Sequence, residues 1–304
     1  MRATTFGLAA TFVAFGASAA EPLVSPEWLA ENLEQPNLVV LDVRNRIDGG
    51  SPAVHRAGHI PGAIYSDYAN DGWRVTVDGV PALLPPADQL EALIGGLGID
   101  EGDHVVIVHS GVNATDFGSA ARVYFTLDQA GHDAISILDG GYAAWTADAN
   151  RPVETGQRAI TPVSYEIDVE PQGIWTADDV VATLGSDDHV LLDARPLAQF
   201  DGHAKHPLAQ RPGHIPGATH FDQSTWFEPE SATLRPLDEV VAGLPPAVAE
   251  GETPIVSYCN TGHWAVTNWF MLTQVLGRSD VEVYDGSMVD WTADEQRPVA
   301  TTGS

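Results

Sequence analysis

The sequence predicts an α/β fold made of two similar domains, each a mostly parallel sheet flanked by helices. The chain of 304 residues exceeds the usual length of one domain, and 44% of its residues are apolar, which is enough for two cores. The second half repeats segments of the first half in the same order. Short continuous apolar runs alternate with stretches of helical character, a pattern typical of strands that are buried on both faces of a parallel sheet.

The internal repeat consists of four matched segments. A strand-like run ending in Asp-x-Arg occurs at 38–44 and 190–195, and a Gly-His-Ile-Pro-Gly-Ala turn occurs at 58–63 and 213–218. An Asp-Gly-Gly/Ser segment followed by a tryptophan occurs at 138–145 and 284–291, and an Arg-Pro-Val segment at 151–153 and 297–299. Because the repeated unit spans a whole domain, a solenoid of short repeats is excluded. We expect Trp145 and Trp291 to be core residues.

The individual elements follow from these runs. We predict strands at the apolar runs 38–41, 105–108, 135–138 and 255–258. Helices are predicted between them at 26–33, 86–97, 119–129, 176–184 and 265–276. The resulting domain boundaries are a signal peptide at 1–20, a first domain at 21–153, a linker at 154–172 and a second domain at 173–304. In such sheets, ligands bind beyond the carboxyl ends of the strands.

The N-terminus has the features of an export signal. Arg2 precedes an apolar run at 6–15, and small residues at 16–20 come before Glu21. This pattern predicts a secretory signal peptide that is cleaved near Ala20, and hence a periplasmic or secreted protein. The apolar run is too short for a transmembrane helix, so we expect no membrane span.

The charge of the chain limits its partners. It carries 42 acidic and 14 basic residues, a formal net charge of -28. Nucleic acids and anionic membranes would be repelled by such a chain. The acidic residues are spread over both halves, which favours a highly soluble surface, with adaptation to high salt as an alternative.

The single cysteine, Cys259, is the main candidate for chemistry. It directly follows the predicted strand 255–258, and a short loop, 260–264, separates it from the predicted helix that begins at Ala265. A loop that enters a helix gathers unpaired backbone N–H groups and the positive end of the helix dipole, which stabilise a thiolate, a persulfide or an anionic substrate. Gly262 fits a backbone with positive φ. The alternative is an inert buried cysteine.

The repeated motifs and the cysteine loop occur in the order found in tandem rhodaneses, and the sequence resembles this family of thiosulfate and 3-mercaptopyruvate sulfurtransferases. The resemblance implies two rhodanese-like domains and a sulfurtransferase that takes sulfane sulfur from a small donor, passes it to an acceptor such as cyanide or a thiol, and needs no cofactor. Cys259 would be the nucleophile and persulfide carrier. The loop amides would cradle the persulfide, from Asn260, Thr261, Gly262, His263, Trp264 and Ala265. In the first domain Ser110, followed by a longer loop at 111–118, takes the place of the cysteine, so that domain would be inactive.

Some family features are missing from this sequence. Thiosulfate-type members carry basic residues in the loop and an arginine six residues after the Asp of Asp-x-Arg, where this chain has Gln199. His263, Arg195 or Arg211 would have to supply the cation. We expect Asp193 and Arg195 to form a structural charge-assisted bond. Direct substrate contact by His263 is one of two open readings, and Trp264 would bring an aromatic face to the rim of the site.

Three competing interpretations bear on the function. A phosphatase would need an arginine six residues after the cysteine, where Ala265 stands. A metal site at His203 and His206 lacks a third nearby ligand, so we predict no bound metal and a solvated loop. A non-catalytic exported sulfur carrier, delivering its persulfide to an unidentified partner protein, stays open. Between donors, export favours thiosulfate over 3-mercaptopyruvate.

Overall fold

The computed structural model describes residues 20–229 and 231–302, so nearly all of the predicted signal peptide lies outside the described residues. The first half contains β1 Leu23–Val24, α1 Pro26–Asn32, β2 Leu38–Asp42, α2 Pro52–Ala57, β3 Ile64–Tyr65, β4 Val75–Val77, β5 Val80–Leu83, α3 Ala87–Gly96, β6 His104–Val108, α4 Ala114–Gln129, β7 Ile135–Leu138 and α5 Gly141–Ala147. The second half contains β8 Ile174–Trp175, α6 Ala177–Thr183, β9 Val190–Asp193, α7 Leu197–Phe200, β10 Thr219–His220, the 3-10 helix η1 Gln223–Trp226, α8 Leu237–Ala242, α9 Pro246–Ala249, β11 Ile255–Tyr258, α10 Ala265–Phe270, the π-helix η2 Met271–Val275, β12 Val281–Tyr284 and α11 Ser287–Ala293.

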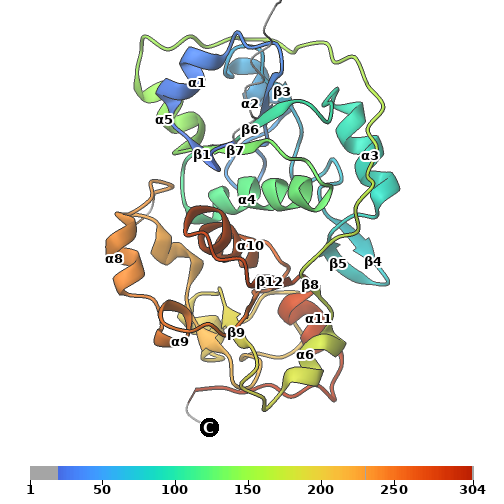
Figure 1. Cartoon of the computed structure of the whole chain (residues 1–304), viewed down its shortest axis with the longest axis vertical. Coiled ribbons are helices and arrows are strands. Elements are labelled where there is room, and N and C mark those ends of the chain that lie inside the picture. The colour runs from blue at the N-terminus through green and yellow to red at the C-terminus, as the bar shows by residue number, and fades with distance from the viewer. Residues whose placement is uncertain (1–19, 230, 303–304) are drawn as a thin grey trace, which may run out of the picture.

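The two halves share one sheet topology, which confirms the predicted fold class. The first sheet has the strand order β1-β7-β6-β2-β3, and the second has the equivalent order β8-β12-β11-β9-β10. Every pairing within these two sheets is parallel, and only the small β4–β5 hairpin is antiparallel. The central strands β6 and β11 are almost entirely buried, because helices cover both faces of each sheet (Figure 1). The continuous apolar runs in the sequence reflect this burial.

One helix begins earlier than its sequence predicts. Helix α4 starts at Ala114, not at residue 119, because the side chain of Asn113 accepts a hydrogen bond from the backbone N–H of Asp116 and caps the helix. The predicted loop at 111–118 is therefore wrong. Gly118 lies within the helix, where a Cβ atom would come within 2.8 Å of the His263 imidazole. Gly118 therefore allows the His263 side chain of the second half to pack closely against helix α4, and it does not mark the end of a loop.

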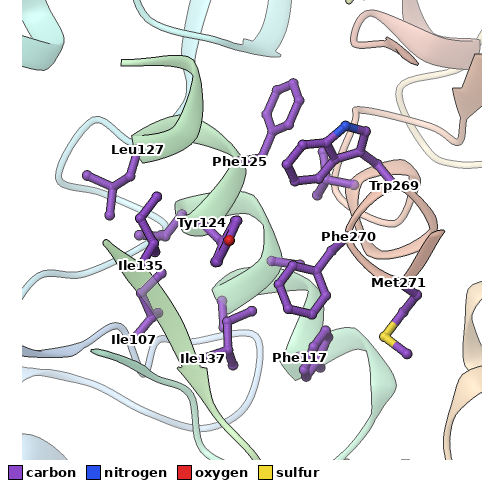
Figure 2. Packing of buried hydrophobic residues seen from close by; sticks show 14 of the residues in the cluster. Ile107, Phe117, Tyr124, Phe125, Leu127, Ile135, Ile137, Trp269, Phe270 and Met271 are labelled. Atoms are coloured by element: carbon purple, nitrogen blue, oxygen red, sulfur yellow. The ribbon is translucent and has the colours of Figure 1, made fainter. Parts of the chain in front are cut away.

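The halves pack through a shared core. Helix α4 lies between the first sheet and the second half, where it contacts α10 (Figure 1). One continuous cluster of buried apolar side chains runs from the first sheet across this interface into the second sheet. Figure 2 shows Phe117, Tyr124 and Phe125 of α4 facing Trp269 and Phe270 of α10. Because the cluster crosses the interface, α4 is buried along almost its whole length.

The outer faces of the two sheets have separate, equivalent cores. Trp145 and Trp291 are both fully buried there, as predicted, and each indole N–H donates to the carbonyl of the proline in the following Arg-Pro-Val segment. The segment 152–173 between the halves runs along the first domain, where Tyr165 is buried and hydrogen-bonds His132. None of the described helices is long and apolar enough to cross a membrane.

Candidate active site

Cys259 follows the last residue of β11 and lies at the carboxyl edge of the second sheet. Its backbone N–H donates to the Ser287 hydroxyl at 3.0 Å, and its carbonyl accepts from the N–H of Met288 at 3.1 Å. The side chain is only 1% exposed and touches the shared core on one side. On the other side it lines a cavity of about 190 Å³. The thiol is therefore packed in place yet reaches a space that a small molecule can occupy.

The loop after Cys259 presents a row of unpaired backbone donors. Within the described part of the chain, no acceptor bonds the N–H groups of Asn260, Thr261, His263, Trp264 and Ala265. Such groups are costly to bury unless a ligand or water satisfies them. Of the loop amides predicted to form a cradle, only that of Gly262 has a protein acceptor, the Ser287 hydroxyl at 3.3 Å. The arrangement is chemically suited to an anion.

Two residues hold this loop in shape: Gly262, whose positive φ was predicted, and Ser287, which sequence reasoning missed. Gly262 has φ +73°, and a Cβ atom there would collide with Asp285 and Arg122. Ser287 has φ +52° and occupies the position of Gly141 in the first half, which has φ +59°. The hydroxyl that Ser287 adds accepts from both Cys259 and Gly262. The change from Gly-Gly to Gly-Ser between the repeats was the available signal.

The first half contains the same loop in a filled form. The pairs Asp42–Val108 and Asp193–Tyr258 are equivalent in the two sheets, so His109 stands where Cys259 stands. The prediction that Ser110 takes this place is wrong by one residue. The Asp116 carboxylate accepts the N–H groups of Ser110, Gly111 and Val112 at 2.5–3.0 Å, and also contacts His109 at 2.9 Å.

This internal comparison shows what the loop geometry binds. In the first half a buried carboxylate occupies the ring of amides, and the helix that begins at Ala114 supplies that carboxylate itself. In the second half the equivalent amides are those of Asn260, Thr261 and Gly262; the first two lack a protein acceptor among the described residues, and only the third donates to the Ser287 hydroxyl. A buried carboxylate is stabilised by several backbone N–H donors, as any compact anion would be.

A second carboxyl group next to the first loop titrates near neutral pH. Burial raises the pKa of Asp48, and the neighbouring Asp116 carboxylate raises it further, to about 7. In the folded state Asp48 therefore keeps its proton above pH 3.8, the pKa of a free Asp side chain. The stability that the folded state gains from this proton is complete at low pH and is lost as the pH rises through 7. We expect Asp48→Asn to gain about 1–2 kcal/mol in unfolding free energy relative to the wild type between pH 5 and 8, allowing for the solvent that reaches this carboxyl. Urea unfolding across this range measures the difference.

The matched control for this effect is Asp187→Asn, which neutralises an exposed carboxyl in the second half. Its unfolding free energy should follow the wild-type pH dependence. Parallel curves for Asp48→Asn and the wild type would contradict the assignment of the neutral-pH proton to Asp48.

His263 joins the cysteine loop to the first half. Its Nε2–H donates to the Thr115 carbonyl at 2.8 Å, since a carbonyl can only accept, so Nδ1 accepts from the Tyr68 hydroxyl at 2.6 Å. Burial and the nearby Arg74 guanidinium lower the pKa of His263 to about 3. The imidazole is neutral and both ring nitrogens have protein partners, so His263 positions the loop and does not supply a cation. Trp264 also contacts Thr115, through its indole N–H at 3.2 Å.

Two buried ion pairs flank the loop. Arg195 bonds Asp193 and the Gly213 carbonyl, and Arg44 makes the same contacts with Asp42 and Gly58 in the first half. The structural reading of Asp193 and Arg195 is thus confirmed. The other pair that flanks the loop, which sequence reasoning missed, joins Arg122 of the first half to Asp285 of the second half. The two side chains form two hydrogen bonds, and the one between Nη2 of Arg122 and Oδ2 of Asp285 measures 2.9 Å.

The cavity at Cys259 contains residues from both halves. Its walls are Ile47, Arg74, Thr115, His206, Cys259, Asn260, Thr261, His263 and Trp264. Ile47, Thr115 and Trp264 also line a neighbouring cleft of about 780 Å³, so the small cavity adjoins a larger one. This places Trp264 at the rim between the two spaces.

The residues that were predicted to supply a cation for the donor do not do so at the cavity. Arg211 donates to the carbonyls of Asp294 and Glu295 and is not among the residues that line the cavity. Gln199, which stands where the family has an arginine, accepts a hydrogen bond from the Asn260 side chain at 2.9 Å. Arg74, which sequence reasoning missed, lines the cavity from the first half.

The loop at 203–206 is only partly solvated. His203 and Lys205 are exposed, but His206 is half-buried and lines the cavity, which corrects the prediction of a solvated loop. Burial and Lys205 lower the pKa of His206, so it is neutral as well. No group of three or more potential metal ligands occurs within residues 20–229 and 231–302.

Comparison with known proteins agrees with this arrangement. The sequence matches the family model of the rhodanese-like domain twice, over residues 25–148 and 176–294. It is 30% identical over 317 residues to the mitochondrial thiosulfate/3-mercaptopyruvate sulfurtransferase 1 of Arabidopsis thaliana, covering 94% of this chain and 80% of that protein. It is 27% identical to the 3-mercaptopyruvate sulfurtransferase of Escherichia coli (strain K12), covering 91% of this chain and 96% of that one.

A solved structure shows the same fold. The 3-mercaptopyruvate sulfotransferase SseA from Escherichia coli superimposes with a TM-score of 0.72 at 24% sequence identity, covering 88% of this chain and 99% of that chain. The tandem arrangement is therefore shared along the whole of that enzyme.

Proposed function

Because this chain belongs to the rhodanese family of sulfurtransferases, we propose that Cys259 is its nucleophile and carries sulfur as a persulfide. The observation that carries the proposal is the row of loop amides without protein acceptors beside a thiol that lines a cavity. The first-half loop supports it, because an anion, the Asp116 carboxylate, occupies the equivalent amides.

The proposed reaction has two steps. In the first, the Cys259 thiolate attacks the outer sulfur of thiosulfate, the S–S bond of the donor breaks, and sulfite leaves with the bonding electrons. The persulfide anion then lies at the loop amides, which stabilise its charge. In the second, the carbon of cyanide or a thiolate attacks the terminal sulfur, and the Cys259 thiolate is regenerated. The transfer is a ping-pong reaction.

Thiosulfate is the donor that we propose first, and 3-mercaptopyruvate is the second candidate. The Arabidopsis relative is named for both donors. With 3-mercaptopyruvate, the C–S bond breaks, pyruvate leaves, and the thiol proton passes to its methyl carbon. The small volume of the cavity, about 190 Å³, fits either donor. The adjoining cleft of about 780 Å³ offers the acceptor a separate approach.

The experiment that tests the proposal measures loading and turnover separately. Intact-mass analysis after treatment with thiosulfate or 3-mercaptopyruvate should show one added sulfur atom, which cyanide then removes as thiocyanate. Steady-state rates with each donor rank the two. Loading without turnover on cyanide or small thiols would favour the alternative, a sulfur carrier that delivers to a partner protein. Absence of loading by both donors would contradict the proposal.

We also propose that the protein is exported. The charge and apolar pattern of residues 1–20 supports a signal peptide cleaved near Ala20, followed by a periplasmic or secreted location. Edman sequencing of the protein purified from its native source should begin near Glu21. A mature chain that still carries Met1 or Arg2 would contradict this proposal.

A further inference from the structure

The arginines around Cys259 differ in whether an acidic side chain neutralises them. Arg122 and Arg195 are buried, and each is neutralised by a buried aspartate, Asp285 and Asp193 respectively. Both histidines in the cavity wall are neutral for the reasons given above. Arg74 is thus the only wall residue of this cavity that carries a permanent charge.

Arg74 itself has no counter-ion. Within the described residues, its guanidinium makes neither a hydrogen bond nor an ion pair, and its Nε is buried without a partner. Among the described residues, its guanidinium makes a cation–π contact with the Tyr68 ring, whose centroid lies 4.6 Å from the guanidinium carbon. An arginine at the wall of a cavity that has no carboxylate partner has its N–H donors available for a ligand.

The backbone of this segment is fixed in place. Trp73 is fully buried and its indole N–H donates to the Ser66 hydroxyl at 2.9 Å, while β4 begins directly after Arg74. Tyr68, beneath the guanidinium, is itself bonded to His263 of the cysteine loop. Arg74 is therefore held against the loop, although it belongs to the half without a cysteine.

We propose that Arg74 binds the anionic group of the sulfur donor, the sulfonate-like end of thiosulfate or the carboxylate of a mercapto acid. The inference rests on the proposed function and assigns it a donor-binding residue from the first half. A planar guanidinium can bond two oxygens of either group while the donor sulfur meets Cys259. The same contact holds the charge of the leaving sulfite or pyruvate. The cation that the second half lacks at Gln199 is thus supplied across the interface.

The test compares Arg74→Gln and Arg74→Lys with the wild type under ping-pong kinetics, with thiosulfate and with 3-mercaptopyruvate as donors and a neutral thiol, 2-mercaptoethanol, as acceptor. Loss of a charge-assisted bond should lower kcat/KM for the donor about 10- to 100-fold in Arg74→Gln. The value for the acceptor should stay within about two-fold of the wild type, because the acceptor meets an enzyme already loaded with sulfur. Arg74→Lys should retain part of the activity.

Arg56→Gln is the matched control, since it removes the same charge from an exposed position of α2 in the same half. It should leave both constants unchanged. An unchanged donor kcat/KM in Arg74→Gln, or an equal fall in the donor and acceptor constants, would overturn the role of Arg74. Failure of the wild type to load sulfur from either donor would instead overturn the proposed function, so the two failures are distinguishable. Donor-specific loss with only one of the two anions identifies the donor that Arg74 serves.

Discussion

Cys259→Ser is expected to abolish sulfur transfer, with kcat/KM falling by at least about 1,000-fold. A serine hydroxyl is a far weaker nucleophile and cannot hold a sulfane sulfur as a stable persulfide. Because Cys259 is the only cysteine in the chain, no other side chain can take over the sulfur. Coupled measurement of thiocyanate release and intact mass should show neither product nor an added sulfur atom in the variant.

The fold should survive this substitution. The exchange conserves the shape of a side chain that is 1% exposed, so the unfolding free energy should change by less than about 2 kcal/mol. Circular dichroism and urea unfolding of the variant provide the check. A folded Cys259→Ser protein that keeps more than about one hundredth of the wild-type kcat/KM would show that the sulfur carrier is not this residue.

Arg122→Met is expected to destabilise the protein by about 3–5 kcal/mol, because it leaves the Asp285 carboxylate buried and without its counter-ion. Arg122 is fully buried and Asp285 is 3% exposed. Asp285 also accepts the N–H of Leu84 at 2.8 Å, so it joins two segments of the first half to the second half. Urea unfolding at pH 7 measures the loss.

Two further variants test the cause of this loss. In Arg122→Met/Asp285→Asn the buried charge is gone while an acceptor for Leu84 stays, so the double variant should be more stable than Arg122→Met alone. Arg235→Gln breaks an exposed pair with Glu239 on the surface and should cost less than about 1 kcal/mol. Equal losses for Arg122→Met and the double variant would show that side-chain packing, and not the unpaired charge, accounts for the effect.

The local features of the fold followed from the sequence because each depends on neighbouring residues. Strands buried on both faces leave continuous apolar runs such as 105–108, and the position of Cys259 between strand and helix required only adjacency. The Asp193–Arg195 bond joins residues two positions apart. The predicted start of helix α4 was wrong because Gly118, which favours a loop in the sequence, lies within the helix. A glycine is needed there because the His263 side chain of the other half packs closely against it.

Apart from Ser287, which lies in the same half as Cys259, the parts of the candidate site that sequence reasoning missed depend on contacts between the halves or on sheet register. Arg74, Tyr68 and Arg122 lie more than one hundred residues from the side chains they meet around Cys259. No periodicity or motif in one sequence indicates such a contact. The equivalence of His109 and Cys259 likewise needed the pairing of β2 with β6 and of β9 with β11.

The Asp116 carboxylate in the first-half loop has a consequence for stoichiometry. With this internal anion bonded to the amides of Ser110, Gly111 and Val112, small anions such as sulfite have one ring of free amides to enter in each molecule, and not two. Saturation curves should therefore be hyperbolic with a single equivalent at their end point. Titration of that equivalent counts the competent molecules in a preparation.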